Sequence, residues 1–436
     1  PATTEIYTET KSSAASDVYK RQMYYQIINS CDVSLWGVSQ KDRIAKVLAK
    51  TGNPEPVNRM SKVSESDKIL LLDANYLFEA NVIVRLIAND QGILLSSCDG
   101  GIAGVWAERK KVEAILPWLK NTPGKKLTFS IPSYTAEQLT GGYDPRLRKF
   151  DLSHVIRVTN SNKATLEKYL YDKSYKGITD LVTKWLWPVP ARAAVKLCVQ
   201  KSITPNMVTG FGWLLTIASG FAFYYGEYAL GLIAAWIMTF LDTVDGKLAR
   251  VTMQSSKIGH AMDHGLDIIH PPIWYWCWAM GLGVQEISLA GISIPTMTWV
   301  WIMVIAYIAG RIFEGLFQLF FNDISIFCWR QIDSFNRLVT ARRNPCIILL
   351  TLSLFAFGEI WGFVWVVMWT VISTLILAVR FFAGANARLK EPLTSWIEHI
   401  NPAQEKPPLV VRLFTGHPAQ KTIAPLLKAN FNDSAD

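Results

Sequence analysis

The sequence has few cysteines and histidines, six of each, and the cysteines are scattered. Its six cysteines form no CxxC pair and no His–Cys cluster, which argues against a zinc site and against a disulfide framework. The formal net charge is +9, but there is no zinc knuckle, aromatic RNA-binding motif or basic helical run, so we expect no nucleic-acid partner. Residues 1–22 lack the apolar core of a signal peptide, and we expect this segment to be non-native or disordered, without a function.

Hydrophobic residues make up 50% of the chain, and long apolar runs are concentrated after residue 203. A helix needs about 20 apolar residues to cross the hydrocarbon core of a bilayer. Six stretches span this length or nearly so, which predicts an all-α, six-span membrane domain. The predicted spans are 206–226, 228–250, 258–281, 297–321, 345–358 and 362–384.

Lysine and arginine are absent from the connections near 227, 282–296 and 358–362, whereas the opposite ends of the spans are basic. Basic loops stay on the cytoplasmic side of a membrane. We therefore expect a multi-pass protein of the cell (inner) membrane, with both termini cytoplasmic. The carboxylates described next would then also face the cytoplasm.

The run from 242 to 267 places four aspartates within two of the predicted spans. Ionisable groups at membrane depth are costly, so such a cluster indicates a functional site. Asp242 and Asp245 share one face of a helix, and Asp263 and Asp267 share a face of the next. A divalent cation would remove the repulsion between them, and oxygen ligands favour Mg²⁺ or Mn²⁺. A cation path through a transporter or channel is the alternative interpretation.

The same run reads D-x2-D-G-x2-A-R-x8-G-x3-D-x3-D, which matches the signature of the CDP-alcohol phosphotransferase family at all eight positions. Those positions are filled by Asp242, Asp245, Gly246, Ala249, Arg250, Gly259, Asp263 and Asp267. The chain resembles this family over about 166–390. The resemblance implies transfer of a substituted phosphate group from a CDP-alcohol to an acceptor hydroxyl, with release of CMP. It also implies a lipid-bilayer setting and a homodimer.

The resemblance also implies roles for individual residues. Asp242, Asp245, Asp263 and Asp267 correspond to the metal ligands, and Asp267 to the general base for the acceptor hydroxyl. The predicted nucleotide-binding residues are Asn206, Thr209, Asp242, Gly246, Ala249, Arg250 and Gly259. Asn206 and Thr209 belong to this set because the family commonly has a TPN stretch beside its nucleotide pocket. A plain helix N-terminus would explain them as well.

Five further charged residues are candidates for an acceptor or phosphate site. Arg311 and Glu314 lie three residues apart in the fourth span, where they form either a structural ion pair or part of the acceptor pocket. Arg337, Arg342 and Arg343 flank one end of the fifth span. A phosphate-bearing acceptor or a lipid headgroup would require such arginines, but the placement of basic residues at cytoplasmic ends also accounts for them.

Residues 23–165 predict a soluble α/β domain with a mostly parallel sheet, because apolar strands such as Lys68–Asp73 alternate with helical stretches. Asp73 at a strand end suits either a metal or a loop cap. The domain resembles the Rossmann-like cytidylyltransferase part of bifunctional inositol-phosphate enzymes. It lacks their GGxGxR-like loop, so we expect a degenerate domain, with an active, CDP-alcohol-forming domain as the alternative. The expected segments are 1–22, the domain 23–165, an amphipathic juxtamembrane segment 166–203, the phosphotransferase domain 204–390 and a cytoplasmic tail 391–436.

Overall fold

The computed structural model divides the chain into two compact units, described one at a time below. Unit 1 comprises Pro1–Tyr143, Asp151–Lys173 and Gly416–Asp436, and unit 2 comprises Asp144–Phe150 and Ser174–Thr415. The residues described are 23–51, 54–57, 60–89, 92–121, 131–144, 147–255, 257–400, 408–415 and 417–432. Within these ranges the side chains of 118, 120, 121, 257–264, 266, 267, 417, 418 and 428–432 are not described. The predicted non-native segment 1–22 therefore lies outside the described residues.

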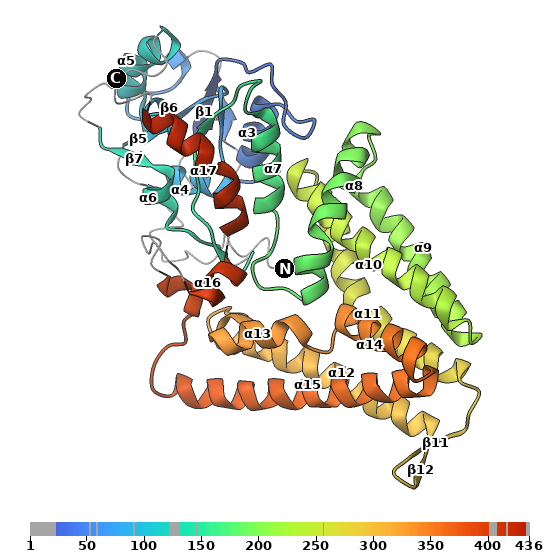
Figure 1. Ribbon diagram of the computed structural model, residues 1–436. Helices are drawn as coiled ribbons and strands as arrows, with labels where there is room; N and C mark the ends of the chain where they lie inside the picture. Colours follow the sequence, from blue (N-terminus) through green and yellow to red (C-terminus); the bar gives the residue numbers. More distant parts are fainter. Residues whose placement is uncertain are drawn as a thin grey trace. The chain divides into compact units, whose positions relative to one another are not determined.

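Unit 1 is built on a six-stranded sheet with the order β2-β1-β3-β6-β5-β7 (Figure 1). The central strand β3 is the predicted run Lys68–Asp73, and its side chains from Ile69 onward are buried. The other strands are β1 Tyr24–Ile28, β2 Glu55–Pro56, β5 Ile93–Ser96, β6 Ile102–Glu108 and β7 Ser133–Thr135, with short strands β4 Tyr76–Leu77 and β10 Ile156–Arg157. The short strand β8 Tyr143–Asp144 lies at the boundary of the two units, and β9 Lys149–Phe150 belongs to unit 2. The helices are α3 Gln40–Leu48, α4 Ala80–Ile87, α5 Arg109–Asn121, α6 Ala136–Thr140 and α7 Lys163–Lys173, with the 3₁₀ turn η1 Met60–Lys62.

The sheet is mixed. Strand β1 pairs in parallel with β2 and β3, and β5 with β7, but β6 is antiparallel to both β3 and β5. Strand β6 is antiparallel to β5 because only a few residues join them, including Gly100 at φ +80°, and parallel strands need a long crossover. The α/β character of the predicted domain is thus confirmed, whereas a Rossmann-like fold is not.

The chain returns to unit 1 near its C-terminus as helix α17, His417–Asn432. Ala419 and Ile423 of α17 are buried in one apolar cluster with Leu166 and Tyr169 of α7. Lys168 of α7 also donates a 2.5 Å hydrogen bond to the hydroxyl of Thr422. The structural division therefore differs from the predicted segments, because unit 1 includes α7 and, from the predicted tail, α17, whereas residues 391–400 and 408–415 belong to unit 2.

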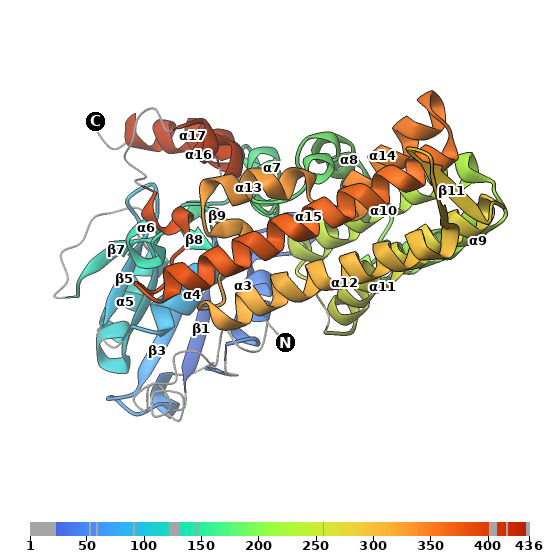
Figure 2. The same cartoon turned by 90° about the horizontal axis from the view of Figure 1, so that it is seen from below.

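Unit 2 is helical. Helix α9 contacts both α10 and α11, and α12 and α15 run side by side along much of their length (Figures 1 and 2). The helices are α8 Pro188–Gln200, α9 Pro205–Tyr224, α10 Tyr228–Val251, α11 Lys257–Gly281, α12 Thr296–Phe320, α13 Gln331–Val339, α14 Arg343–Ala356, α15 Glu359–Arg388 and α16 Leu409–Phe414. The shorter elements are the π-helical turn η2 Val182–Leu186, the 3₁₀ turns η3 Ile326–Cys328 and η4 Trp396–His399, and the hairpin β11 Glu286–Leu289 and β12 Ile292–Pro295.

Small residues let the long helices of unit 2 approach closely. A Cβ at Gly384 of α15 would lie 2.6 Å from the ring of Phe317 on α12, and one at Gly310 of α12 would lie 2.9 Å from the hydroxyl of Thr374 on α15. The same threonine donates a 2.7 Å hydrogen bond to the carbonyl of Ala306. Such contacts between small and polar residues are typical of helix pairs packed within a membrane.

The helices coincide closely with the six predicted spans. Among the fully described helices, α9, α10, α12 and α15 are long and apolar enough to cross a membrane. Helices α13 and α14 qualify only together, as one span bent by 47°, where the sequence predicted a short fifth span over 345–358. Helix α11 occupies the predicted third span, but its first half lies partly outside the described side chains. The structure therefore gives four or five candidate spans in its described part, and a sixth remains a prediction.

Candidate active site on helices α9, α10 and α14

Helix α10 carries the first two aspartates of the signature. Asp245 is buried, with 7% of its surface exposed, and its Oδ2 accepts a 2.6 Å hydrogen bond from the hydroxyl of Thr209 on α9. Helix α9 starts at the cap residue Thr204, whose hydroxyl accepts a hydrogen bond from the backbone of Met207, and Pro205 occupies the first turn. Thr209 thus lies one turn into α9 and connects it to the buried carboxylate.

Asp242 lies one helical turn before Asp245 and pairs with an arginine from another helix. Its Oδ2 is 2.5 Å from Nη2 of Arg343, the first residue of α14, and its side chain is 23% exposed. Arg343 also places Nη1 3.7 Å from the sulfur of Met238 on α10. One of the three arginines proposed from the sequence for a phosphate site therefore lies directly beside the aspartates.

Gly246, Ala249 and Arg250 continue the signature toward the end of α10. The Arg250 guanidinium folds back over Gly246, because a Cβ built at that glycine would lie 3.1 Å from Nη2. Arg250 and Asn206 are exposed, while Gly246 and Ala249 are partly exposed. A ligand therefore has access to most of the predicted nucleotide-binding residues whose side chains are described.

Gly259, Asp263 and Asp267 lie outside the described side chains. Their backbone belongs to helix α11, so the four-residue spacing does put them on one face of a helix, as predicted. Within the described part of the chain no three His, Cys, Asp or Glu side chains gather as a metal site. The two described carboxylates, Asp242 and Asp245, still fit Mg²⁺ or Mn²⁺, since both supply hard oxygen ligands one helical turn apart.

Arg311 and Glu314 form an ion pair within α12, and Glu314 also pairs with Arg342, the residue that caps α14. The side chains are 19%, 13% and 28% exposed, and the Arg311 guanidinium carbon lies 5.7 Å from the ring centre of Tyr307. The structure thus shows the ion pair that the sequence left open and adds Arg342 to it. This triad joins α12 to the start of α14.

Arg337 is 8% exposed and lies 5.5 Å from the ring centre of Phe327. Its charge acts on Asp180, a buried residue just before η2. Burial opposes ionisation of Asp180, but Arg337 and hydrogen bonds from Thr183 and Asn344 outweigh burial, and the pKa of Asp180 is lowered. The Asn344 amide on α14 is 2.9 Å from Oδ1 of Asp180. Arg337 therefore helps to attach the juxtamembrane segment to α13 and α14.

Lys247 has a structural part that the sequence did not reveal. It is 2% exposed, donates a 3.1 Å hydrogen bond to the carbonyl of Ser174, and lies 3.3 Å from the ring centre of Tyr175. A lysine two residues after Asp245, inside an apolar span, already indicates that its charge needs a partner. Its partners lie more than seventy residues away along the chain, so the pattern alone did not identify them.

Asp73 in unit 1 performs the loop-capping role that was one of its two interpretations. It is 2% exposed, and its Oδ1 accepts a 2.8 Å hydrogen bond from the backbone of Asn75. Burial raises its pKa, although the hydrogen bonds from Asn75 and Asn29 oppose this shift. Nothing around Asp73 marks it as a metal ligand in the described residues.

Comparison with known proteins places the site in a family. Residues 202–325 match the family model described as CDP-alcohol phosphatidyltransferase. The chain is 36% identical over 78 residues to archaetidylinositol phosphate synthase of Pyrococcus horikoshii, covering 18% of this chain and 42% of that protein. It is 29% identical over 117 residues to cholinephosphotransferase 1 of Xenopus laevis, covering 24% and 27%. The chain thus spans less than half the length of these curated relatives.

The site and these matches define the class of the matched range: a transferase-family domain that contains candidate membrane spans. Residues 202–325 form a domain of the CDP-alcohol phosphatidyltransferase family, as the signature predicted. The matched range contains α9, α10, α11 and α12, and therefore every residue of the signature. Unit 1 lies outside it, and its likeness to a nucleotidyltransferase is not confirmed.

Proposed function

We propose that the protein transfers a substituted phosphate group from a CDP-alcohol, either CDP-diacylglycerol or a CDP-polyol, to an acceptor hydroxyl. The observation that carries this proposal is the arrangement around α10. Two carboxylates one turn apart, Asp242 and Asp245, are held by Thr209 from α9 and Arg343 from α14. Two carboxylates in an apolar span cost free energy, so their presence indicates a function. A cation-dependent site that binds a pyrophosphate is such a function.

The residues divide the reaction between them. Arg250 and Arg343 would bind phosphate oxygens of the donor as two-pronged donors. Asp267 would accept the proton of the acceptor hydroxyl, whose oxygen forms the new bond to phosphorus while the bond from that phosphorus to CMP breaks. Gly246 and Gly259 would let the nucleotide approach the backbone, with Asn206 and Ala249 beside it.

Asp242, Asp245, Asp263 and Asp267 would hold the Mg²⁺ or Mn²⁺. When bound, this ion neutralises the pyrophosphate and makes CMP a better leaving group. We further propose that the active site and both termini face the cytoplasm at the cell (inner) membrane, and that the protein is a homodimer. The distribution of basic residues supports the first of these, and the resemblance to the family supports the second.

The test measures CMP release by purified protein in detergent, with CDP-diacylglycerol or a CDP-polyol and a panel of acceptors. Asp242→Asn, Asp245→Asn and Asp263→Asn should each abolish Mg²⁺- or Mn²⁺-dependent release. Asp323→Asn is the matched control, because Asp323 is exposed and lies beyond the end of α12. Wild-type turnover in any of the first three variants removes that residue from the ligand set, and mass spectrometry of the products identifies the acceptor.

Two other functions predict different results. A cation transporter would give ion flux in proteoliposomes without CMP release. A bifunctional enzyme would also release pyrophosphate from CTP when given an alcohol phosphate, through unit 1. The buried, loop-capping position of Asp73 does not favour this second activity.

A further inference from the structure

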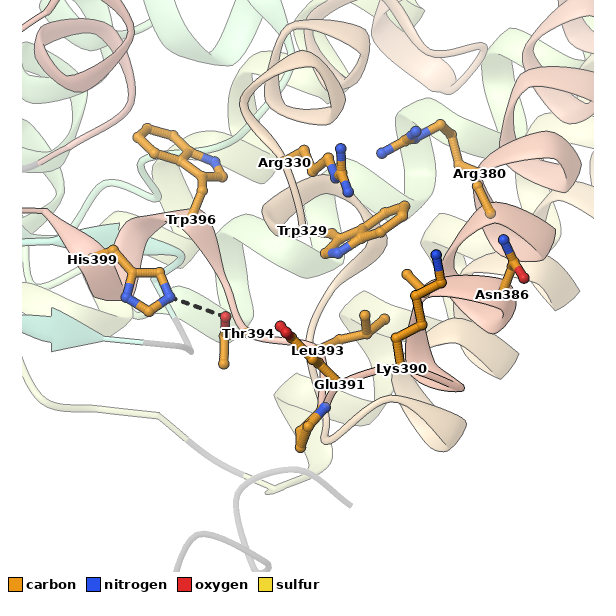
Figure 3. Close-up of a pocket in the computed structure, with 13 residues that line it drawn as sticks. Trp329, Arg330, Arg380, Asn386, Lys390, Glu391, Leu393, Thr394, Trp396 and His399 are labelled. Atoms are coloured by element: carbon orange, nitrogen blue, oxygen red, sulfur yellow. Dashed lines mark hydrogen bonds between the residues drawn. The ribbon is translucent and has the colours of Figure 1, made fainter.

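A cavity of about 680 Å³ lies at the end of α15, outside the range matched to the family. Figure 3 shows its charged and aromatic side chains around one space, contributed by α15, the segment that follows it and the residues just after η3. It shares no residue with the aspartate site on α10. The side chains used in the argument, named together the basic-aromatic pocket, are Trp329, Arg330, Arg380, Lys390, Trp396 and His399.

Trp329 organises the positive charge of this pocket. The guanidinium carbons of Arg330 and Arg380 lie 4.8 Å and 4.4 Å from the centre of its ring. Arg380 is further fixed by two hydrogen bonds to Asp333, of 2.5 Å and 2.9 Å. Both guanidinium groups are thus held by their surroundings before any ligand arrives, which lowers the entropic cost of binding an anion.

The charges in the pocket do not cancel. Asp333 offsets Arg380, but Arg330 and Lys390 are both exposed and have no carboxylate within 4.0 Å among the residues described. Glu391 is the acidic residue of the lining, and His399 adds a titratable ring that contacts the hydroxyl of Thr394. The uncompensated charge therefore favours an anionic ligand, and arginine with lysine suits phosphate in particular.

The pocket opens beside an apolar surface. Val379 and Phe382 of α15 and Leu389, which caps it, are 66%, 64% and 85% exposed, and each is adjacent in sequence to a residue that lines the pocket. Trp329 and Trp396 lie in the segments that follow the candidate spans α12 and α15, and tryptophan is enriched at the level of lipid headgroups. Phosphate in the pocket and acyl chains along α15 would fit one phospholipid molecule.

We propose that the basic-aromatic pocket binds the phosphate group of a phosphate ester, and that the exposed apolar strip of α15 makes a membrane phospholipid its source. The proposal does not depend on the transfer reaction. It assigns a second, non-catalytic lipid site to unit 2, formed by the end of α15, the segment that leads into η4, η4 itself and the residues just after η3.

Binding is measured by native mass spectrometry on the full-length protein in detergent, with dioctanoyl phosphatidylglycerol as the probe and dioctanoylglycerol as its phosphate-free match. The double variant Arg330→Gln/Lys390→Gln should weaken binding at least about tenfold, since hydrogen bonds to charged groups are the stronger ones. The control is Arg388→Gln, which removes an exposed charge at the end of α15. Arg388 does not line the pocket, so this variant should leave binding unchanged. Both substituted side chains are exposed, and size-exclusion chromatography checks that the variants fold.

Glycerol 3-phosphate is the second probe and separates the two sources of phosphate. Weak competition by it supports a lipid headgroup, and binding as tight as that of the lipid supports a phosphate-ester site supplied from solution. Equal binding of dioctanoylglycerol and the phospholipid would overturn the proposal. So would equal losses in the double variant and in Arg388→Gln. Asp242→Asn should not change this binding, so failure here is distinguishable from failure of the proposed transfer.

Discussion

Replacing Thr209 by valine tests whether the hydrogen bond between α9 and α10 supports the active site. Valine keeps the branched shape of threonine but cannot donate to Asp245, whose carboxylate is 7% exposed and accepts this bond at 2.6 Å. A hydrogen bond to a charged group contributes about 1.5–3 kcal/mol. Residues that orient a metal ligand typically cost about 10–100-fold in affinity or activity when replaced. We therefore expect a loss of about 10–100-fold in kcat/KM for CMP release.

The assay is a Mg²⁺ titration of CMP release, repeated over a range of CDP-alcohol concentrations so that kcat and KM are both measured. The variant should need more Mg²⁺, because Asp245 is no longer held in one orientation. Thr209→Ser keeps the hydroxyl and should behave like the wild type. Thr216→Val is the matched control on the same helix. Its hydroxyl donates to the backbone carbonyl of Gly212 at 2.9 Å and contacts no aspartate, so activity should be retained.

Two results would refute this reasoning. Unchanged turnover and Mg²⁺ dependence in Thr209→Val would mean that the hydrogen bond does not orient Asp245. A raised KM for the CDP-alcohol with an unchanged Mg²⁺ dependence would instead make Thr209 a nucleotide contact, which is the role the sequence predicted for it.

Two further predictions concern stability. Lys173→Met leaves Glu79 buried without its 2.6 Å ion pair, so unit 1 should lose about 3–5 kcal/mol near neutral pH, measured by hydrogen exchange in the sheet. Burial disfavours both charged groups, but their ion pair outweighs burial, so the pKa of Glu79 is lowered and that of Lys173 is raised. In the wild type, the stabilisation by charged Glu79 is lost as the pH falls through its lowered pKa. The difference in stability between wild type and Lys173→Met should therefore shrink at low pH. Gly384→Ala should lower the Tm by a destabilisation of about 1–3 kcal/mol, because the new methyl group meets the Phe317 ring at 2.6 Å. Gly315→Ala on α12 enters open space and should not lower it; equal Tm values for these two variants would contradict the packing argument.

The sequence was most informative where a feature is local and continuous. Long apolar runs predicted the helices of unit 2 to within a few residues, and the apolar run Lys68–Asp73 is strand β3. Strand β6 was not predicted, although it is continuous and mostly buried. That strand decides that the sheet is mixed. The family was predictable because eight residues at fixed spacing form a specific signature, although no single one of these positions identifies a family.

Contacts between distant parts of the chain were not predictable. The pair of Asp242 and Arg343 joins residues 101 positions apart, and the bond from Lys168 to Thr422 joins residues 254 apart. A charged residue expected to be buried must have a partner, but the sequence does not show which distant residue that partner is. For this reason the sequence pattern indicated a group of arginines near α14 but did not separate Arg343, beside the aspartates, from Arg342, which pairs with Glu314.

The juxtamembrane segment shows how such distant contacts change the interpretation of a domain. Lys247, two residues after Asp245, holds the backbone at Ser174, and Asn344, one residue after Arg343, holds Asp180. Residues that border the aspartate site on two helices are thus the same ones that fasten this segment. Because a buried lysine and a buried aspartate each need these partners, the segment cannot detach without exposing unsatisfied charge in unit 2. From Ser174 onward the segment is therefore a part of the unit that holds the active-site helices, more than a linker leading into it.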